Sequence, residues 1–293
     1  MKHDLKDYNC LGELRHINIK GRSIQEVREY LKPGEPFIIN DLPQEWKAYE
    51  KWNIEYLNNK VGHKTISYVQ LDNNNMTSYE TKQTPKFSYL IDNLNQILSP
   101  ELRQKKHQAL YLVISRIMSH PNARNIQLPE LLPDMNLPSF IPIHRLWEIN
   151  LWIGAGGNKS NLHYDPEENL LVVMTGSKKL VLFQPSYRKF LYQYREKNTN
   201  TLQSRVNLFD IDRSLFPEID HAKYYQTTIY SGETVYIPPG WWHAVESSKE
   251  LNIAININWL PSANYLFRIG NPAREYILNH STLLKSILFP YRR

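Results

Sequence analysis

The stretch that decides the fold is Asn169-Leu-Leu-Val-Val-Met-Thr-Gly-Ser-Lys-Lys-Leu-Val-Leu-Phe183. Its two apolar runs, 169–174 and 178–183, are separated by Thr-Gly-Ser, and this arrangement predicts a β-hairpin. Similar short runs follow at 225–230, 233–237 and 251–259, and in the last of these isoleucine and asparagine alternate. Many short strands separated by turn residues indicate a sandwich or a jelly roll.

The rest of the chain divides around this β-rich part. With 293 residues, 41% of them hydrophobic and 22% charged, the chain can bury a large core and has no signature of disorder. We predict an N-terminal α/β flanking region over 1–110, a β core over 111–260 and C-terminal helices over 261–293. The segment 186–223 lacks strand periodicity, and we interpret it as an insertion in the core.

The N-terminal flank has clear helix signals. Ser23-Ile-Gln-Glu26 is a capping box, and it predicts a helix that ends at Pro33-Gly34 and is followed by a short buried strand. A second helix is expected over about 53–59 and an amphipathic helix over 87–98. None of these elements carries obvious chemistry, so we expect them to form a layer that packs on the core.

Metal-ligating side chains stand at two places in the β core. One is His163-Tyr-Asp165, and the other is His243, which follows the turn Pro-Pro-Gly-Trp-Trp. Residues i and i+2 of a strand share a face, so His163 and Asp165 are expected to point the same way. Two imidazoles and one carboxylate are the ligand set of a mononuclear non-haem Fe(II) site with open positions. Catalytic zinc is the rival metal, and a histidine packed in the core is the alternative interpretation of His243.

The composition bears on partners and compartment. The chain has 35 basic and 29 acidic residues, a net charge of +6, which fits either solubility or a basic face for RNA or an acidic protein. The single cysteine, Cys10, excludes an intrachain disulfide and fits a reducing, cytoplasmic setting. No secretion signal is visible, and no apolar run is long enough to span a bilayer, so we expect no membrane partner.

At these motifs the chain resembles the cupin-like JmjC dioxygenases, which use Fe(II) and 2-oxoglutarate. The resemblance rests on Asn150-Leu-Trp-Ile-Gly154, His163-Tyr-Asp165, the hairpin with Lys178, and Tyr236-Ile-Pro-Pro-Gly-Trp-Trp-His243. The resemblance is strong over residues 111–260. Within the family, the chain looks most like the subgroup that contains the asparaginyl hydroxylase of hypoxia-inducible factor and the tRNA wybutosine hydroxylase. It implies a mainly β fold with flanking helices around a double-stranded β-helix, a cupin-like jelly roll.

The resemblance also implies roles for individual residues. It makes His163, Asp165 and His243 the iron ligands, and it makes Lys178 and Tyr111 partners of the far carboxylate of 2-oxoglutarate. Three further residues would lie near the cosubstrate: Ser160, Asn169 and Asn256, with Asn258 as the alternative to the last. Val113 departs from the pattern, because the asparaginyl hydroxylase has a substrate-binding glutamine there.

The implied activity is hydroxylation of a C–H bond with conversion of 2-oxoglutarate to succinate and carbon dioxide. We expect a protein side chain as substrate, with RNA or a small molecule as alternatives, and demethylation stays open because hydroxylation beside a methylated nitrogen has that result. A metal-binding cupin that is non-catalytic or non-oxidative is the alternative of another class. Substrate contacts are expected from loops and from the insertion at 186–223, and a homodimer is expected through the C-terminal helices.

Overall fold

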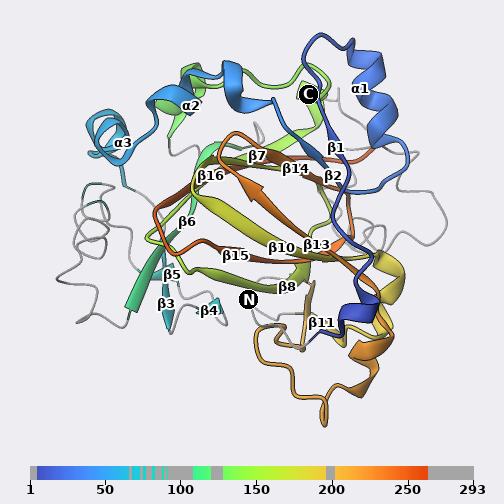
Figure 1. Ribbon diagram of the computed structural model, residues 1–293. Helices are drawn as coiled ribbons and strands as arrows, with labels where there is room; N and C mark the ends of the chain where they lie inside the picture. Colours follow the sequence, from blue (N-terminus) through green and yellow to red (C-terminus); the bar gives the residue numbers. More distant parts are fainter. Residues whose placement is uncertain are drawn as a thin grey trace, which may run out of the picture.

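The computed structural model describes residues 5–65, 68–72, 75–76, 81–82, 88, 91, 108–119, 128–195 and 202–262. The fold is cupin-like and mainly β, as the sequence predicts (Figure 1). The described strands are β1 His16–Ile17, β2 Phe37–Ile39, β3 Tyr68–Asp72, β4 Asn75–Met76, β5 Thr81–Lys82, β6 Gln108–Ser119, β7 Leu146–Gly154, β8 Lys159–Tyr164, β9 Glu168–Thr175, β10 Ser177–Phe183, β11 Gln193–Arg195, β12 Leu202–Ser204, β13 Tyr224–Tyr230, β14 Thr234–Ile237, β15 Trp242–Ser247 and β16 Asn252–Trp259.

The strands from β7 to β16 build two facing layers of the jelly roll. One layer has the neighbour order β7-β16-β9-β14 and the other has β8-β15-β10-β13, and all of these pairs are antiparallel. These strands alternate between the layers along the chain, except that β10 and β13 are neighbours in the second layer, and this is the winding of a double-stranded β-helix. The two strands expected over 169–183 are present as β9 and β10, but the prediction that they form a hairpin was wrong, because they lie in different layers and do not pair with each other.

Helices cover the outside of the first layer (Figure 1). The capping box at Ser23 is formed, because its side chain accepts from the Glu26 N–H while the Glu26 carboxylate accepts from the Ser23 N–H at 2.8 Å. The described helices are α1 Ile24–Leu31, α2 Lys47–Lys51 and α3 Ile54–Val61, with the 3-10 helices η1 Asp7–Asn9, η2 Pro43–Glu45, η3 Pro129–Asp134, η4 Ile143–Arg145, η5 Pro185–Lys189 and η6 Pro217–His221.

The alternation along β16 decides which side chains face the helices. Ile253, Ile255 and Ile257 are completely buried in the core that also contains Trp46 and Trp52. The asparagines at the intervening positions therefore face the space between the two layers. Burying a large apolar side chain contributes about 1.5–3 kcal/mol, so this pattern fixes the strand's orientation and turns its polar row inward.

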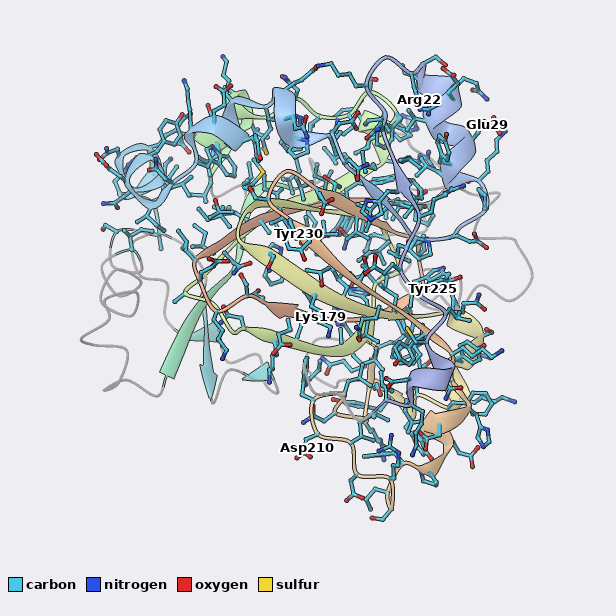
Figure 2. All side chains as sticks on the ribbon, viewed as in Figure 1. Arg22, Glu29, Lys179, Asp210, Tyr225 and Tyr230 are labelled. Carbon is cyan, nitrogen blue, oxygen red and sulfur yellow. The ribbon has the colours of Figure 1, made fainter. Side chains whose placement is uncertain are left out.

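The segment 186–223 contains more regular structure than its sequence indicates. Although the sequence there shows no strand periodicity, β11 and β12 form a hairpin and β12 pairs with β8. Each strand has only three residues, too few to produce a visible period. Figure 2 shows Asp210 of this insertion at the opposite end of the molecule from Arg22 and Glu29 beside and within α1.

Parts of the chain outside the described residues carry other predictions. These are the C-terminal helices with the expected dimer contact and, apart from two single positions, the helix over 87–98. The flank contributes directly to the β-sheet, since β2 pairs with β14. The division of the chain at 110 and 260 stays a prediction. Within the described part, every helix is too short or too polar to cross a bilayer.

Candidate metal centre

The three predicted ligands come from adjoining strands of the second layer. His163 lies in β8 and is the direct cross-strand partner of His243 in β15, while Asp165 lies just past the end of β8. The Gly240 N–H donates to the Asp165 carbonyl oxygen at 2.9 Å, and this bond ties the turn before His243 to the segment with the carboxylate. Gly240 has φ of 79°, a conformation that favours glycine. The segment around Gly240 and the segment around Asp165 are thereby held side by side at the site.

The ligand atoms converge on one point. One nitrogen or oxygen atom from each of His163, Asp165 and His243 lies within 4.8 Å of the others. The His243 Nε2 atom is 3.7 Å from Asp165 Oδ2, and the two imidazole centroids are 4.3 Å apart. Ligands about 2.0–2.2 Å from a shared ion are separated by at most about 4.4 Å. Small side-chain rotations therefore suffice to bring all three onto one metal ion.

Backbone carbonyls fix the tautomer of both histidines. The Nδ1 atom of His163 is 2.7 Å from the Asn161 carbonyl oxygen, and that of His243 is 3.1 Å from the Trp241 carbonyl oxygen. A carbonyl can only accept, so each Nδ1 carries the proton and each Nε2 presents a lone pair. Burial and the neighbouring His163 lower the pKa of His243, which keeps this ring neutral as a metal ligand requires.

Lys178 lies in the same cavity and is 2% exposed, whereas the adjacent Lys179, labelled in Figure 2, is partly exposed. The Lys178 ammonium donates to Ser247 Oγ at 2.9 Å. Burial lowers the pKa of Lys178 to about 8, because the charged form loses hydration. A carboxylate entering the cavity would restore the favourable environment of that charge, so Lys178 is suited to bind an anion.

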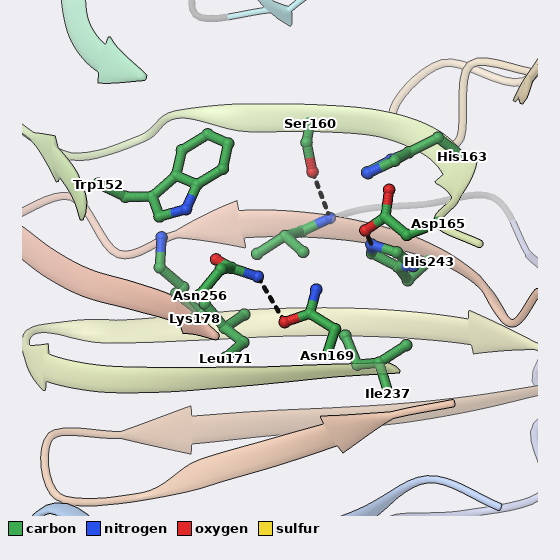
Figure 3. A pocket seen from close by; sticks show the side chains of 11 residues that line it. Trp152, Ser160, His163, Asp165, Asn169, Leu171, Lys178, Ile237, His243 and Asn256 are labelled. Atoms are coloured by element: carbon green, nitrogen blue, oxygen red, sulfur yellow. Dashed lines mark hydrogen bonds and ion pairs between the residues drawn. The ribbon is translucent and has the colours of Figure 1, made fainter. Parts of the chain in front are cut away.

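Three further predicted residues line this cavity (Figure 3). The Ser160 hydroxyl accepts the Val245 N–H at 3.1 Å, and the Asn256 amide donates to Asn169 Oδ1 at 2.7 Å. Asn256 rather than Asn258 lines the cavity, and Asn258 donates to Glu148 instead. The backbone of Tyr111 pairs with Gly154, while its side chain and that of Val113 lie outside the described residues, so the predictions for them remain open.

The cavity also contains residues that the sequence interpretation did not identify. These are Trp152, Leu171, Ile237 and Val245. The volume of about 70 Å³ exceeds what several water molecules need, so hydrocarbon does not fill the space. Figure 3 shows Lys178 under Trp152 at one end and Asp165 with both histidines at the other. Trp152 stands in the Asn-Leu-Trp-Ile-Gly motif, and strand alternation was the signal that could have placed it inside.

Two carboxyl groups follow Asp165, the partly buried Glu167 and the buried Glu168. Burial, with the charges of Asp165 and Glu148 adding to it, raises the pKa of Glu167 well above its ordinary value. Burial also raises the pKa of Glu168 to about 7, although Arg145 and a hydrogen bond from Tyr236 act in the opposite direction. Only Glu167 has Asp165 among the causes of its raised pKa, because Glu168 precedes Asn169 in β9 and points away from the cavity that Asn169 lines.

The inserted hairpin extends the layer that carries the histidines. Gln203 of β12 is the direct partner of His163, and Tyr194 of β11 is the partner of Gln203. Residues paired in this way project from one face of a sheet, so Tyr194, Gln203, His163 and His243 form one row. The Tyr194 hydroxyl donates to Gln203 Oε1 at 3.2 Å. The insertion thus adds polar side chains to the same face as the candidate ligands.

The fold and this arrangement define a cupin-type barrel with a candidate metal site between its layers. The sequence profile described as "Cupin-like domain" matches residues 23–265, and the chain belongs to that family.

Relatives agree with this assignment. Lysine-specific demethylase JMJ31 of Arabidopsis thaliana is 27% identical over 84% of this chain and 49% of its own length. Bifunctional peptidase and (3S)-lysyl hydroxylase JMJD7 of Homo sapiens is 25% identical over 78% of each chain. The human tRNA wybutosine-synthesizing protein 5 is 24% identical over 84% of this chain and 79% of its own. The chain spans about half the length of the Arabidopsis demethylases JMJ31 and JMJ30.

Proposed function

We propose that the chain is an Fe(II)- and 2-oxoglutarate-dependent oxygenase that hydroxylates a C–H bond, with a protein side chain as substrate. The observation that carries this proposal is the presence of two chemically different anchors in one cavity. His163, Asp165 and His243 provide two nitrogen ligands and one oxygen ligand, and Lys178 provides a buried cation. A scaffold that only bound a metal would need no buried ammonium.

The donor set fits ferrous iron. Two neutral imidazoles and a carboxylate on one face leave open positions, which suits a metal that also binds a cosubstrate and oxygen. When bound, iron and 2-oxoglutarate supply the activation of O₂, with succinate and carbon dioxide as coproducts. Zinc is disfavoured by the same arrangement, because the buried Lys178 has no task in metal-assisted hydrolysis at such a site.

The protein side chains would have separate tasks around that chemistry. Lys178 would hold the far carboxylate of 2-oxoglutarate as a point charge, and Ser247 keeps the ammonium in place. The Ser160 hydroxyl, which accepts a backbone N–H, can donate its own proton toward the cavity. Asn169 and Asn256 hold each other through their amides and so would present a fixed polar wall to a cosubstrate beside them.

Turnover of 2-oxoglutarate tests the proposal directly. The full chain with Fe(II), O₂ and labelled 2-oxoglutarate should release succinate slowly without any substrate, and His163→Ala should abolish this release. The exposed His221 offers a matched control, because its replacement removes an imidazole that does not line the cavity. A wild-type protein that neither binds nor consumes 2-oxoglutarate would identify a non-catalytic or non-oxidative cupin and refute the proposal.

RNA is the second candidate substrate, favoured by the net charge of +6 and by the similarity to a protein named for tRNA wybutosine synthesis. Protein is favoured by the similarity to proteins named lysine-specific demethylase and lysyl hydroxylase. Mass spectrometry of candidate proteins and of tRNA after incubation would separate the two, because the product gains one oxygen atom. The cytoplasmic location stays a prediction.

A further inference from the structure

Three connections between strands meet at the end of the cavity that contains Lys178. They are 155–158 between β7 and β8, Gly176 between β9 and β10, and 248–251 between β15 and β16. Lys178 is the direct cross-strand partner of Ser247, and its ammonium donates to Ser247 Oγ. Lys178 follows closely after Gly176, and Ser247 directly precedes 248–251. The connections therefore determine where this pair lies.

Ser248 joins these three connections. Its N–H donates to the Ser177 carbonyl oxygen at 2.9 Å, and its Oγ accepts the Ser177 N–H at 3.2 Å. Its carbonyl oxygen accepts the Gly157 N–H at 2.7 Å. Ser177 and Ser248 directly adjoin Lys178 and Ser247 in the sequence. The bonds of Ser248 therefore continue the ladder that places the ammonium opposite its acceptor.

Asn252 holds Ser248 in place from the first residue of β16. Its side chain is 1% exposed, and its Nδ2 donates to Ser248 Oγ at 3.0 Å, to the Ser248 carbonyl oxygen at 3.3 Å and to the Glu250 carbonyl oxygen at 2.9 Å. Turning the amide around would place its oxygen against these three acceptors, so its orientation is fixed. We call Ser248 and Asn252 the turn clamp.

Two glycines let the neighbouring connections pack directly on the turn clamp. Gly176 has φ of 81°, and a Cβ atom there would lie 2.8 Å from Asn252 Nδ2. Gly156 has φ of 105°, and a Cβ atom there would lie 2.4 Å from the Lys249 carbonyl carbon. Both positions thus require glycine for its conformation and for its size. The three connections are packed so closely that none of them can shift alone.

We propose that the turn clamp positions the ammonium of Lys178 for the far carboxylate of 2-oxoglutarate. This inference rests on the proposed function and deepens it. A lysine ammonium is a compact charge on a flexible four-carbon stem, so the side chain alone does not define where the charge lies. The base of the stem and the Ser247 hydroxyl define it, and the turn clamp holds both. Ser248 and Asn252 lie outside the described lining of the cavity, so they act through Lys178 as positioning residues.

Two keto acids that differ only at the far end test the turn clamp. 2-Oxopentanoate has the chain length of 2-oxoglutarate but carries a methyl group in place of the far carboxylate. Dissociation constants of both would be measured on the full chain loaded with Fe(II) without oxygen. Wild type should prefer 2-oxoglutarate about tenfold or more. Ser248→Ala and Asn252→Leu should each reduce this preference about fivefold, through weaker binding of 2-oxoglutarate alone.

Matched variants separate positioning from a general loss of structure. Ser248→Thr keeps the hydroxyl group and should keep the wild-type preference. Ser231→Ala removes a hydroxyl that donates to the Met174 carbonyl oxygen in the adjoining β13–β14 turn, and it should also leave the preference unchanged. In a Lys178→Met background the substitutions in the turn clamp should have no further effect on the preference, because they act through that ammonium.

The outcomes distinguish this inference from the proposed function. Thermal unfolding shows which variants are folded, and the milder Ser248→Ala keeps the test open where Asn252→Leu does not fold. An unchanged preference in a folded variant of the turn clamp would overturn the inference alone. Equal weakening of both keto acids would do the same, since it would reveal a purely structural role. Wild-type protein without any preference would refute the proposed function and this inference together.

Discussion

His163 and His243 are direct cross-strand partners, and their imidazole centroids lie 4.3 Å apart. Two of the three candidate ligands are therefore positioned by one ladder of backbone hydrogen bonds, and only Asp165 depends on a turn. Each imidazole ring is oriented by a nearby backbone carbonyl. The two Nε2 atoms are therefore in position before a metal ion binds. Metal binding should consequently need little rearrangement of the backbone.

Replacing one ligand should abolish metal binding without unfolding the protein. His163→Ala is expected to weaken Co(II) or Mn(II) binding by more than about 100-fold, the upper range for loss of an outer partner. Its metal-free thermal unfolding midpoint should stay near that of wild type, because the side chain is only half-buried. Calorimetric metal titration checks the first expectation, with His221→Ala as control. Wild-type affinity in the variant would exclude His163 as a ligand.

Lys178 is expected to strengthen 2-oxoglutarate binding and to lower the free energy of unfolding of the cosubstrate-free protein. Lys178→Met is expected to weaken 2-oxoglutarate binding about tenfold or more, since it removes a charge-assisted hydrogen bond. The same change should leave the free energy of unfolding of the cosubstrate-free protein equal or higher, because a buried ammonium is no longer desolvated. Equilibrium dialysis and urea unfolding measure the two effects. Lys179→Met, on the adjacent partly exposed residue, should change neither.

Glu168 should make stability depend on pH. Its pKa is raised to about 7, above the ordinary value of 4.5, mainly by burial. The folded state therefore holds a proton that the unfolded state loses, and stability falls as pH rises from about 4.5 to 7. At 1.36 kcal/mol per unit the loss is roughly 3 kcal/mol. Urea unfolding at several pH values should show a flatter profile for Glu168→Gln, and an identical slope in both proteins would contradict this assignment.

The inserted hairpin should affect the substrate and leave the cosubstrate alone. Gln203→Leu is expected to raise the KM for a protein or peptide substrate about fivefold, the effect of losing one hydrogen bond. Succinate release without substrate should be unchanged. Gln193 is the matched control, because it lies one residue from Tyr194 on the same strand and faces the opposite way. Equal effects of both replacements would argue for a general disturbance of the hairpin.

The sequence predicted those features whose signal lies within a few residues or repeats over a long run of residues. The capping box at Ser23, the isoleucine and asparagine alternation of 251–259 and the spacing of His163 and Asp165 each carry their own physical reason, and the structure contains them. The layer exchange between β9 and β10 was not predictable, because a Gly turn looks the same in a simple hairpin.

Other features required the register of distant strands. The hydrogen bond from Asn258 to Glu148 joins residues that are 110 positions apart, and nothing near either residue indicates the other. The choice of Asn256 over Asn258 as a cavity residue also follows from the register, since both face the same side of β16. Three-residue strands such as β11 are too short for any periodic signal.

The attachment of the hairpin has an evolutionary consequence. The insertion joins the barrel through the backbone pairing of Leu202 and Gln203 with Tyr164 and His163 at one strand edge. An insertion attached in this way can change in length and composition while the metal ligands keep their positions. Natural diversification or laboratory recombination could therefore exchange this segment to obtain new substrates from an unaltered oxidising centre.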